Sequence, residues 1–178
     1  MLRMILRAFV LLLLSTLPAQ AGDIITSAIA DLQAGVICAP KVIDHVPAPD
    51  TVAGVQNVIE GDPQFVTNGR TVPAVIGIGF AIKAQAAGQD LPEVTIVVTH
   101  PPMGPGGVTR ESYQTSIRAD RLSLTAWQFE HEYELVTGPW TVSAWAGDRM
   151  VYSVTFDVVP PAMLPELAAT CGFEELLS

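Results

Sequence analysis

The stretch GPWTVSAWAGDRMVYSVTFDVV, Gly138–Val159, carries the strongest structural signal in the chain. A period of two, rich in β-branched and aromatic residues, is typical of a half-buried strand. Gly147 and Asp148 tolerate a positive φ, which suits the loop of a hairpin. The stretch therefore predicts a β-hairpin around Ala146–Arg149 with a buried and a wet face. The buried set is Trp140, Val142, Ala144, Tyr152, Val154, Phe156 and Val158, and the wet set is Thr141, Ser143, Trp145, Ser153, Thr155 and Asp157.

Other short strands are predicted outward from this hairpin. Val72–Ala84 is almost wholly apolar, which indicates a strand covered on both faces, with Gly77 and Gly79 marking a bulge or close packing. The remaining predicted strands are Gln33–Cys38, Val55–Glu60, Glu93–His100, Arg110–Arg118 and Leu122–Leu135. Proline-rich Asp44–Asp50 and Pro101–Gly107 are predicted as loops, Asp23–Leu32 as a weak helix or a mobile start, and Pro165–Leu177 as a helical turn or short helix.

Seven or so short strands separated by turns, without amphipathic helices between them, favour an antiparallel, immunoglobulin-like β-sandwich, with a small barrel as the second possibility. The likeness to antibody domains is architectural only. Their cross-sheet disulfide joins two central strands, whereas Cys171 lies beyond the last predicted strand.

The chain ends add three segments to this domain. Met1–Ala21 has two arginines, a short apolar run and a small-residue cleavage site, and predicts a secretory signal peptide. The predicted organisation is therefore 1–21 signal peptide, 22–34 N-terminal segment, 35–160 β-sandwich domain, and 161–178 C-terminal segment tied back by a disulfide. We expect a periplasmic or secreted protein, with no membrane insertion after cleavage because the apolar run is too short to span a bilayer.

The net charge of the chain limits the classes of partner it can bind. Of nine basic and 18 acidic residues, only Arg3 and Arg7 lie in the predicted signal peptide, so the mature chain would have a net charge of −11. Such a surface repels phosphate backbones and anionic lipids. The sequence therefore predicts no nucleic-acid partner, and leaves an unknown protein or small ligand as the partner.

Two cysteines, Cys38 and Cys171, stand near opposite ends of the mature chain. An even count in an exported protein favours a disulfide, and a redox site would need a Cys-x-x-Cys motif that the chain lacks. We expect a structural disulfide between them, with two buried thiols as the alternative.

Longer pieces of the chain resemble a known family. The pieces are VPAVIGIGF with Gly77–Phe80, the proline-rich VTHPPMGPGGV, and YELVTGPWT at the start of the hairpin. Together they are similar to a bacterial family of small exported proteins built on a single domain of unknown function, over most of Gly35–Pro160. The resemblance implies a β fold and no catalytic residues.

Candidate metal ligands are few. His100 and Met103 offer a nitrogen and a thioether on one loop, which suits copper in an oxidising compartment, and Met150 and His45 could join them by folding. The spacing is not specific, so the sequence predicts no cofactor and keeps His100 and Met103 as low-ranking metal candidates. Zinc lacks a paired His/Cys motif.

Two further features could be functional or structural. The alternation over Trp127–Leu135 predicts His131 on a core-like aromatic face and Glu130, Glu132 and Glu134 on a solvated one. Trp145 lies among polar positions, where it could stack on a sugar or anchor a partner protein. The alternative is that the C-terminal segment covers Trp145.

Hydrolase signatures such as Gly-x-Ser-x-Gly, His-Glu-x-x-His and Ser-x-x-Lys do not occur. The sequence therefore favours a binding or structural module over an enzyme, with a copper-binding protein or an unrecognised hydrolase as the alternatives.

Overall fold

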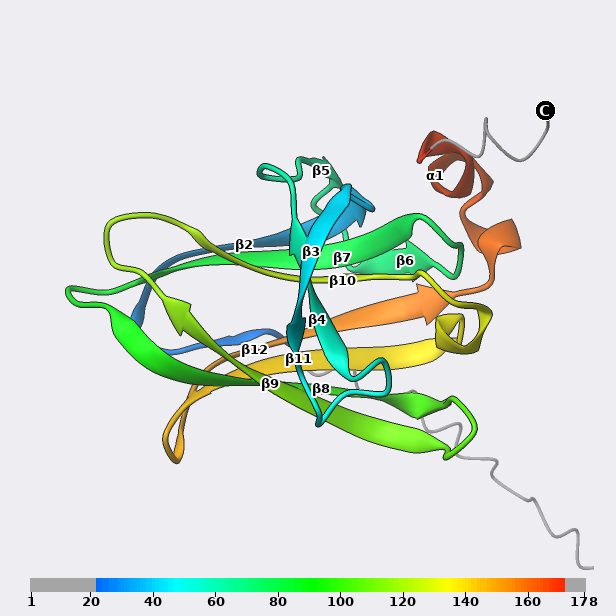
Figure 1. The fold of residues 1–178 in the computed structure, drawn as a ribbon. Coiled ribbons are helices and arrows are strands. Elements are labelled where there is room, and N and C mark those ends of the chain that lie inside the picture. The colour runs from blue at the N-terminus through cyan, green and yellow to red at the C-terminus, as the bar shows by residue number, and fades with distance from the viewer. Residues whose placement is uncertain (1–21, 172–178) are drawn as a thin grey trace, which may run out of the picture.

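The computed structural model describes residues 22–171, and two β-sheets pack face to face in it (Figure 1). A six-stranded sheet has the order β1-β12-β11-β8-β9 with β6 beside β12, and a four-stranded sheet has the order β10-β7-β2-β5. All pairs are antiparallel except β6–β12, so the predicted antiparallel, immunoglobulin-like β-sandwich is confirmed. The strands are β1 (Ile24–Ile25), β2 (Ile29–Cys38), β3 (Val42–Pro47), β4 (Val55–Ile59), β5 (Phe65–Thr67), β6 (Thr71–Pro73), β7 (Ile78–Ala86), β8 (Leu91–Met103), β9 (Val108–Ile117), β10 (Ser123–Gln128), β11 (Gly138–Ala146) and β12 (Arg149–Val159).

The predicted hairpin is β11–β12. Its turn is Gly147–Asp148, where only Gly147 has a positive φ, of 63°. The register places Trp140 opposite Phe156 and Thr141 opposite Thr155. Every residue of the predicted inner set is buried, and none of the outer set is. The two-residue period has therefore assigned both faces correctly.

The apolar run Val72–Ala84 contains a change of sheet. β6 pairs with β12 in one sheet and β7 lies between β2 and β10 in the other, and Gly77 with φ 84° falls between them. β7 is buried on both faces, as predicted. On its outer side, Lys83 forms an ion pair with Asp62 at 2.6 Å and lies over the Phe65 ring. A Cβ on Gly79 would lie 2.1 Å from the Trp127 carbonyl oxygen, which requires a glycine there.

Two segments for which the sequence predicts no strand contain strands in the structure. The helix predicted in Asp23–Leu32 is wrong: β1 and the first part of β2 lie there, and Thr26 donates its backbone N–H and its hydroxyl to the Val151 carbonyl. The loop predicted in Asp44–Asp50 contains most of β3, which pairs only with β4. Pro47 is tolerated because it ends a strand in a two-stranded sheet, at an edge.

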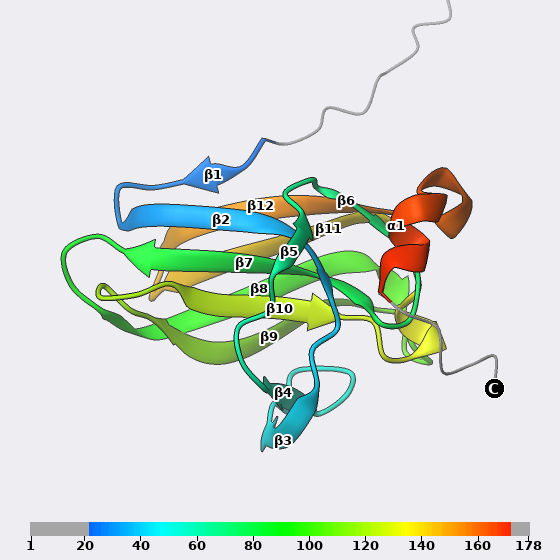
Figure 2. The same ribbon diagram turned by 90° about the horizontal axis from the view of Figure 1, so that it is seen from above.

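We call this two-stranded sheet the β3–β4 ribbon. It runs across one side of the sandwich (Figure 1), and the view from above shows it beside β9 and β10 (Figure 2). β9 and β10 are the edge strands of the two sheets. The ribbon therefore lies over the side on which the sandwich is open.

The predictions around β8 and β10 need correction. β8 continues through Pro101 and Pro102 to Met103, since beyond Thr99 it pairs with β9 alone and loses no central ladder. The long strand predicted over Leu122–Leu135 ends at Gln128 and is followed by the 3-10 turn η1 (Glu132–Glu134).

The described part of the chain closes with a 3-10 turn, η2 (Pro161–Met163), and a short helix, α1 (Pro165–Thr170), as predicted for part of Pro165–Leu177. Cys171 follows the helix and forms the expected disulfide with Cys38 at the end of β2. Leu176 and Leu177 of that prediction, and the signal peptide predicted over Met1–Ala21, lie outside the described residues. Within residues 22–171, no helix is long and apolar enough to cross a membrane.

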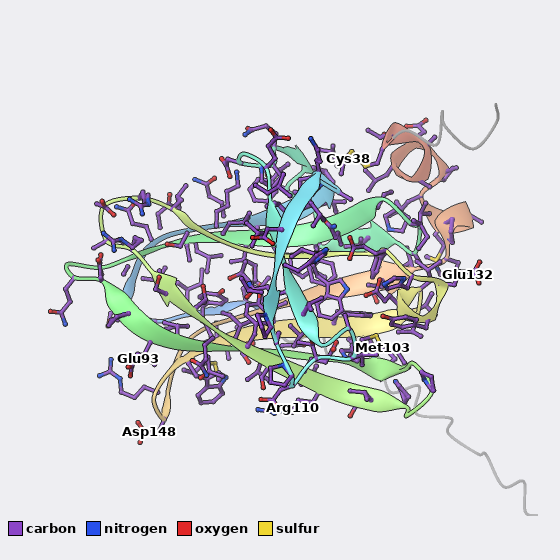
Figure 3. All side chains as sticks on the ribbon, in the orientation of Figure 1. Cys38, Glu93, Met103, Arg110, Glu132 and Asp148 are labelled. Atoms are coloured by element: carbon purple, nitrogen blue, oxygen red, sulfur yellow. A yellow bond between two sulfur atoms is a disulfide. The ribbon has the colours of Figure 1, made fainter. Side chains whose placement is uncertain are left out.

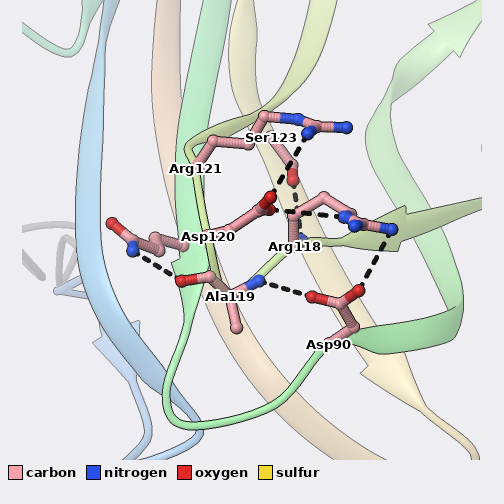
Figure 4. A network of polar contacts seen from close by, with 7 residues as sticks. Asp90, Arg118, Ala119, Asp120, Arg121 and Ser123 are labelled. Carbon is pink, nitrogen blue, oxygen red and sulfur yellow. Dashed lines mark hydrogen bonds and ion pairs between the residues drawn. The ribbon is translucent and has the colours of Figure 1, made fainter.

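A polar network joins the turn between β7 and β8 to the turn between β9 and β10 (Figure 4). Asp90, between β7 and β8, forms an ion pair with the Arg118 guanidinium at 3.0 Å and accepts a hydrogen bond from the Ala119 backbone N–H at 2.8 Å. Gln85 donates to the Ala119 carbonyl at 2.7 Å. The ion pair is well exposed and adds little by itself, so the network serves mainly to fix the two turns together.

Candidate binding cleft

A cleft of about 190 Å³ lies between the β3–β4 ribbon and the open side of the sandwich. One wall comes from β4 and the loop before it, and the other from the edge strands β9 and β10. The apolar part of its lining is Val52, Val55, Ile59, Met103, Leu124 and Ala126, and the aromatic part is Tyr113 and Trp127. Mostly apolar concavities with a few polar groups are typical of small-molecule sites.

Three polar contacts hold the ribbon in place over the cleft. The Val52 backbone N–H donates to Glu111 Oε1, and the Ser112 backbone N–H donates to the Asp50 carbonyl at 3.1 Å. Asn57 Nδ2 of β4 donates to Glu130 Oε2 at 2.8 Å. The ribbon is therefore attached at the loop before β4 and again along β4 itself.

A buried pair of ionisable side chains lies behind the cleft wall. Glu111 of β9 lines the cleft and is 2% exposed, and its Oε2 lies 3.3 Å from Nε2 of His100 on β8. Nδ1 of His100 lies 2.8 Å from the Pro101 carbonyl oxygen, which accepts only, so Nδ1 carries a proton. Nε2 faces Glu111 Oε2, so each ring nitrogen of His100 lies beside a protein oxygen.

The contact between the two side chains is poorly aligned. Glu111 Oε2 and His100 Nε2 are both buried and neither makes a hydrogen bond with the described residues. The indole Nε1 of Trp127, also a cleft residue, is a third buried atom without a hydrogen-bond partner among the described residues. Buried polar groups are normally hydrogen-bonded, so unsatisfied ones on the wall of a cleft need an explanation.

Aromatic rings hold His100 from the core side. Its imidazole stacks on the Trp140 indole with ring centroids 4.6 Å apart, and the Trp127 centroid lies 6.2 Å away. Trp140 is itself fixed by a hydrogen bond from its indole N–H to the Val136 carbonyl at 3.1 Å. Packing thus fixes the rotamer of His100, so the imidazole that faces Glu111 is held in place.

Two more carboxylates stand at the cleft, Glu130 and Glu134. Glu134 Oε2 accepts the backbone N–H groups of Glu130 at 2.7 Å and His131 at 2.9 Å. Burial raises the pKa of Glu134 above its ordinary value, and these two hydrogen bonds oppose the shift. Glu130 accepts from Asn57 and, at 2.7 Å, from Gln128. Both side chains are therefore held by neighbours rather than free to wrap an ion.

This turn overturns the face assignment made for Trp127–Leu135. His131, predicted on a core-like face, is exposed and stacks on Tyr133 with centroids 5.0 Å apart. Glu134, predicted on a solvated face, is buried. The cause is the end of β10 at Gln128: the period of two stops there, and the Glu134 carboxylate turns inward to accept the N–H groups of Glu130 and His131 just before the 3-10 turn.

The metal candidates are not gathered into one site. Met103 lines the cleft, whereas both ring nitrogens of His100 face protein oxygens. His45 is exposed on β3, and Met150 pairs with Trp145 opposite Thr95, five residues along β8 from His100. No three His, Cys, Asp or Glu side chains of residues 22–171 are arranged to hold a metal ion.

Trp145 is half-buried on the outer face of the six-stranded sheet, and its indole N–H donates to Ser143 Oγ at 3.0 Å. It does not line the cleft. The C-terminal segment, as far as Cys171, lies at the end of the sandwich marked by Cys38, opposite the β11–β12 turn marked by Asp148 (Figure 3). The expectation that this segment covers Trp145 is therefore wrong for the described part of it.

Sequence reasoning missed Glu111. Its signal was present: in Arg110–Arg118 the period of two groups Glu111 with Tyr113 and Ile117, and a carboxylate on an inward face is unusual. Ile117 is buried and Tyr113 is half-buried, which confirms that face.

Comparisons with known proteins place the chain in a family. A family model described as "Domain of unknown function (DUF3859)" matches residues 27–158. A solved immunoglobulin-like protein from Pseudomonas aeruginosa is similar with a TM-score of 0.49 and 20% identity, over 79% of this chain and 99% of that one. No curated protein matches the chain.

Proposed function

The chain belongs to the DUF3859 family of domains of unknown function, and from its cleft we propose that it is an exported protein that binds a small organic ligand beneath the β3–β4 ribbon. The observation that carries this proposal is the cleft itself, whose lining residue Trp127 has a buried indole Nε1 without a hydrogen-bond partner among the described residues. Leaving such a group without a partner costs about 1–3 kcal/mol. A ligand that supplied the missing partner would recover part of this cost.

The shape of the site supports a small ligand rather than a protein partner. A volume of about 190 Å³ suits a molecule of a few to about a dozen non-hydrogen atoms. The apolar walls would hold its body, and the few polar groups would fix its orientation. The ribbon, tied down through Glu111 and Glu130, would cover the bound molecule.

Two features support export to the periplasm or the exterior. Met1–Ala21 has the pattern of a secretory signal peptide. The Cys38–Cys171 disulfide belongs to oxidising compartments and is rare in the cytosol. The acidic composition disfavours nucleic acid as a partner.

A thermal-shift panel of small aromatic and aliphatic amines, alcohols and carboxylates tests the binding proposal. We expect at least one compound to raise the melting temperature in a concentration-dependent manner, because a ligand that binds only the folded state stabilises it. The variant Ala126→Leu, which adds volume to the cleft wall, should lose this response.

The matched control is Ala169→Leu, the same change at an exposed position of α1, which should respond as the parent does. Equal responses of Ala126→Leu and the parent, or a panel without any stabilising compound, would contradict the proposal. The near-ultraviolet circular dichroism of each variant establishes that it is folded.

A further inference from the structure

The charged side chains that line the cleft are all acidic. Among residues 22–171 they are Glu111, Glu130 and Glu134, and neither lysine nor arginine of this part of the chain lines it. The phenol of Tyr113 adds no charge, since burial raises its pKa well above the ordinary 10.0. The cleft is therefore an apolar cavity with a negative electrostatic potential. Apolar walls of low dielectric constant strengthen this potential.

The same three carboxylates act on a neighbouring phenol. The pKa of the Tyr133 phenol, beside the cleft, is raised by its partial burial and then by the charges of Glu134, Glu111 and Glu130. Negative charge from three carboxylates thus acts on one neighbourhood. A cation placed there would be favoured by the same interaction that disfavours the phenolate.

The arrangement suits an organic cation better than a metal ion. A hard metal ion needs several oxygens converging at about 2.0–2.6 Å. Here Glu134 is occupied by two backbone N–H groups and Glu130 by Asn57 and Gln128. Glu111 Oε1 accepts the Val52 backbone N–H and Oε2 faces His100 Nε2, so all three carboxylates already have neighbours, and the remaining wall is apolar and aromatic. Such a wall favours an ammonium group, which takes hydrogen bonds and also packs against indole and phenol rings.

We propose that the ligand of the cleft is a small organic amine, whose ammonium group lies among Glu111, Glu130 and Glu134 and whose apolar body packs against Trp127 and Met103. This inference rests on the proposed function and names its ligand class. The proposal requires a positively charged ligand, so the charge of the ligand can be tested separately from the existence of the site.

Calorimetry with three probes of nearly equal size makes this test: benzylamine, benzyl alcohol and benzoate at pH 7. Benzylamine should bind about tenfold more tightly than benzyl alcohol, because a charged hydrogen bond is stronger than a neutral one, and benzoate should bind more weakly still. Raising the ionic strength should weaken the binding of benzylamine alone.

Charge variants locate the effect. Glu130→Gln removes a cleft charge at an exposed position and should weaken benzylamine about threefold, with little effect on benzyl alcohol. Glu93→Gln is the matched control, because Glu93 is exposed and lies at the other end of the sandwich (Figure 3), and it should leave benzylamine binding unchanged.

Each outcome separates the two proposals. If benzyl alcohol or benzoate binds as tightly as benzylamine and Ala126→Leu abolishes that binding, the cleft is a ligand site but the inferred charge is wrong. If none of the probes binds, or if Ala126→Leu binds benzylamine unchanged, the amine inference falls. An equal loss in Glu130→Gln and Glu93→Gln would also contradict it, since the attraction would then come from overall charge.

Discussion

Replacing Phe156 with alanine is expected to lower the free energy of unfolding by about 3–5 kcal/mol, a large share of the roughly 5–15 kcal/mol that stabilises a domain. Phe156 is fully buried on β12 and stacks on Phe80 of β7 with ring centroids 4.5 Å apart. The two rings belong to different sheets, so the contact joins the layers of the sandwich. The Arg70 guanidinium lies 5.6 Å from the same ring centroid. Truncation would leave a cavity and remove contacts on both sides.

The measurement is urea unfolding of Phe156→Ala beside Thr155→Ala, its neighbour on the outer face. Thr155 is half-buried and shares a hydrogen bond of 2.9 Å with Thr141 on β11, so its loss should cost at most about 1 kcal/mol. Similar losses in the two variants would contradict the assignment of the inner and outer faces.

Removing the disulfide has the second large expected effect. Cys38 and Cys171 are 133 residues apart in sequence, and a cross-link that closes so long a loop restricts the unfolded chain strongly. In the chain-entropy model the stabilisation is about 4–5 kcal/mol. The link also fixes α1, whose Leu167 packs at the edge of the core, to the end of β2. The double variant Cys38→Ser, Cys171→Ser should therefore unfold at a much lower urea concentration.

The parent protein provides the control for this prediction. With a reductant present, the parent should lose stability towards that of the double serine variant, whereas the variant should not respond to the reductant. A parent that keeps its unfolding midpoint when both thiols are shown by alkylation to be reduced would contradict a stabilising role for the disulfide.

Much of the sandwich follows from local pattern. β11 and β12 are long, alternate over most of their length and meet at a glycine turn, so their pairing and their faces are encoded within 22 residues, whereas the bulge between Ala144 and Trp145 is not. β7 is equally clear, because an almost wholly apolar run is expected to be covered on both sides. The short β1 is different: its two isoleucines are half-exposed, and only pairing with β12 makes it a strand. Nothing within such a segment specifies a partner more than a hundred residues away.

The cleft is harder to predict because it depends on contacts between distant segments. The ribbon over it includes β3, whose Pro47 and exposed side chains resemble a loop in sequence. His100 and Met103 were candidates on chemical grounds, and Met103 does line the cleft. The partner of His100 is Glu111, which reaches it across the β8–β9 pair. That contact follows from the strand register, and the sequence pattern alone does not fix the register where β8 becomes irregular after Thr99.

The three tryptophans allow the most direct test of the ligand site. Trp127 lines the cleft, whereas the indole N–H groups of Trp140 and Trp145 already donate to Val136 and Ser143. In an ¹⁵N–¹H correlation spectrum of the folded protein, the three indole signals are separate reporters in one sample. Titration with benzylamine should move the Trp127 indole signal in a saturable way and leave that of Trp145 in place. A Trp127 signal that stays fixed up to the solubility limit of the amine, or a shift confined to Trp145, would contradict a binding site beneath the β3–β4 ribbon.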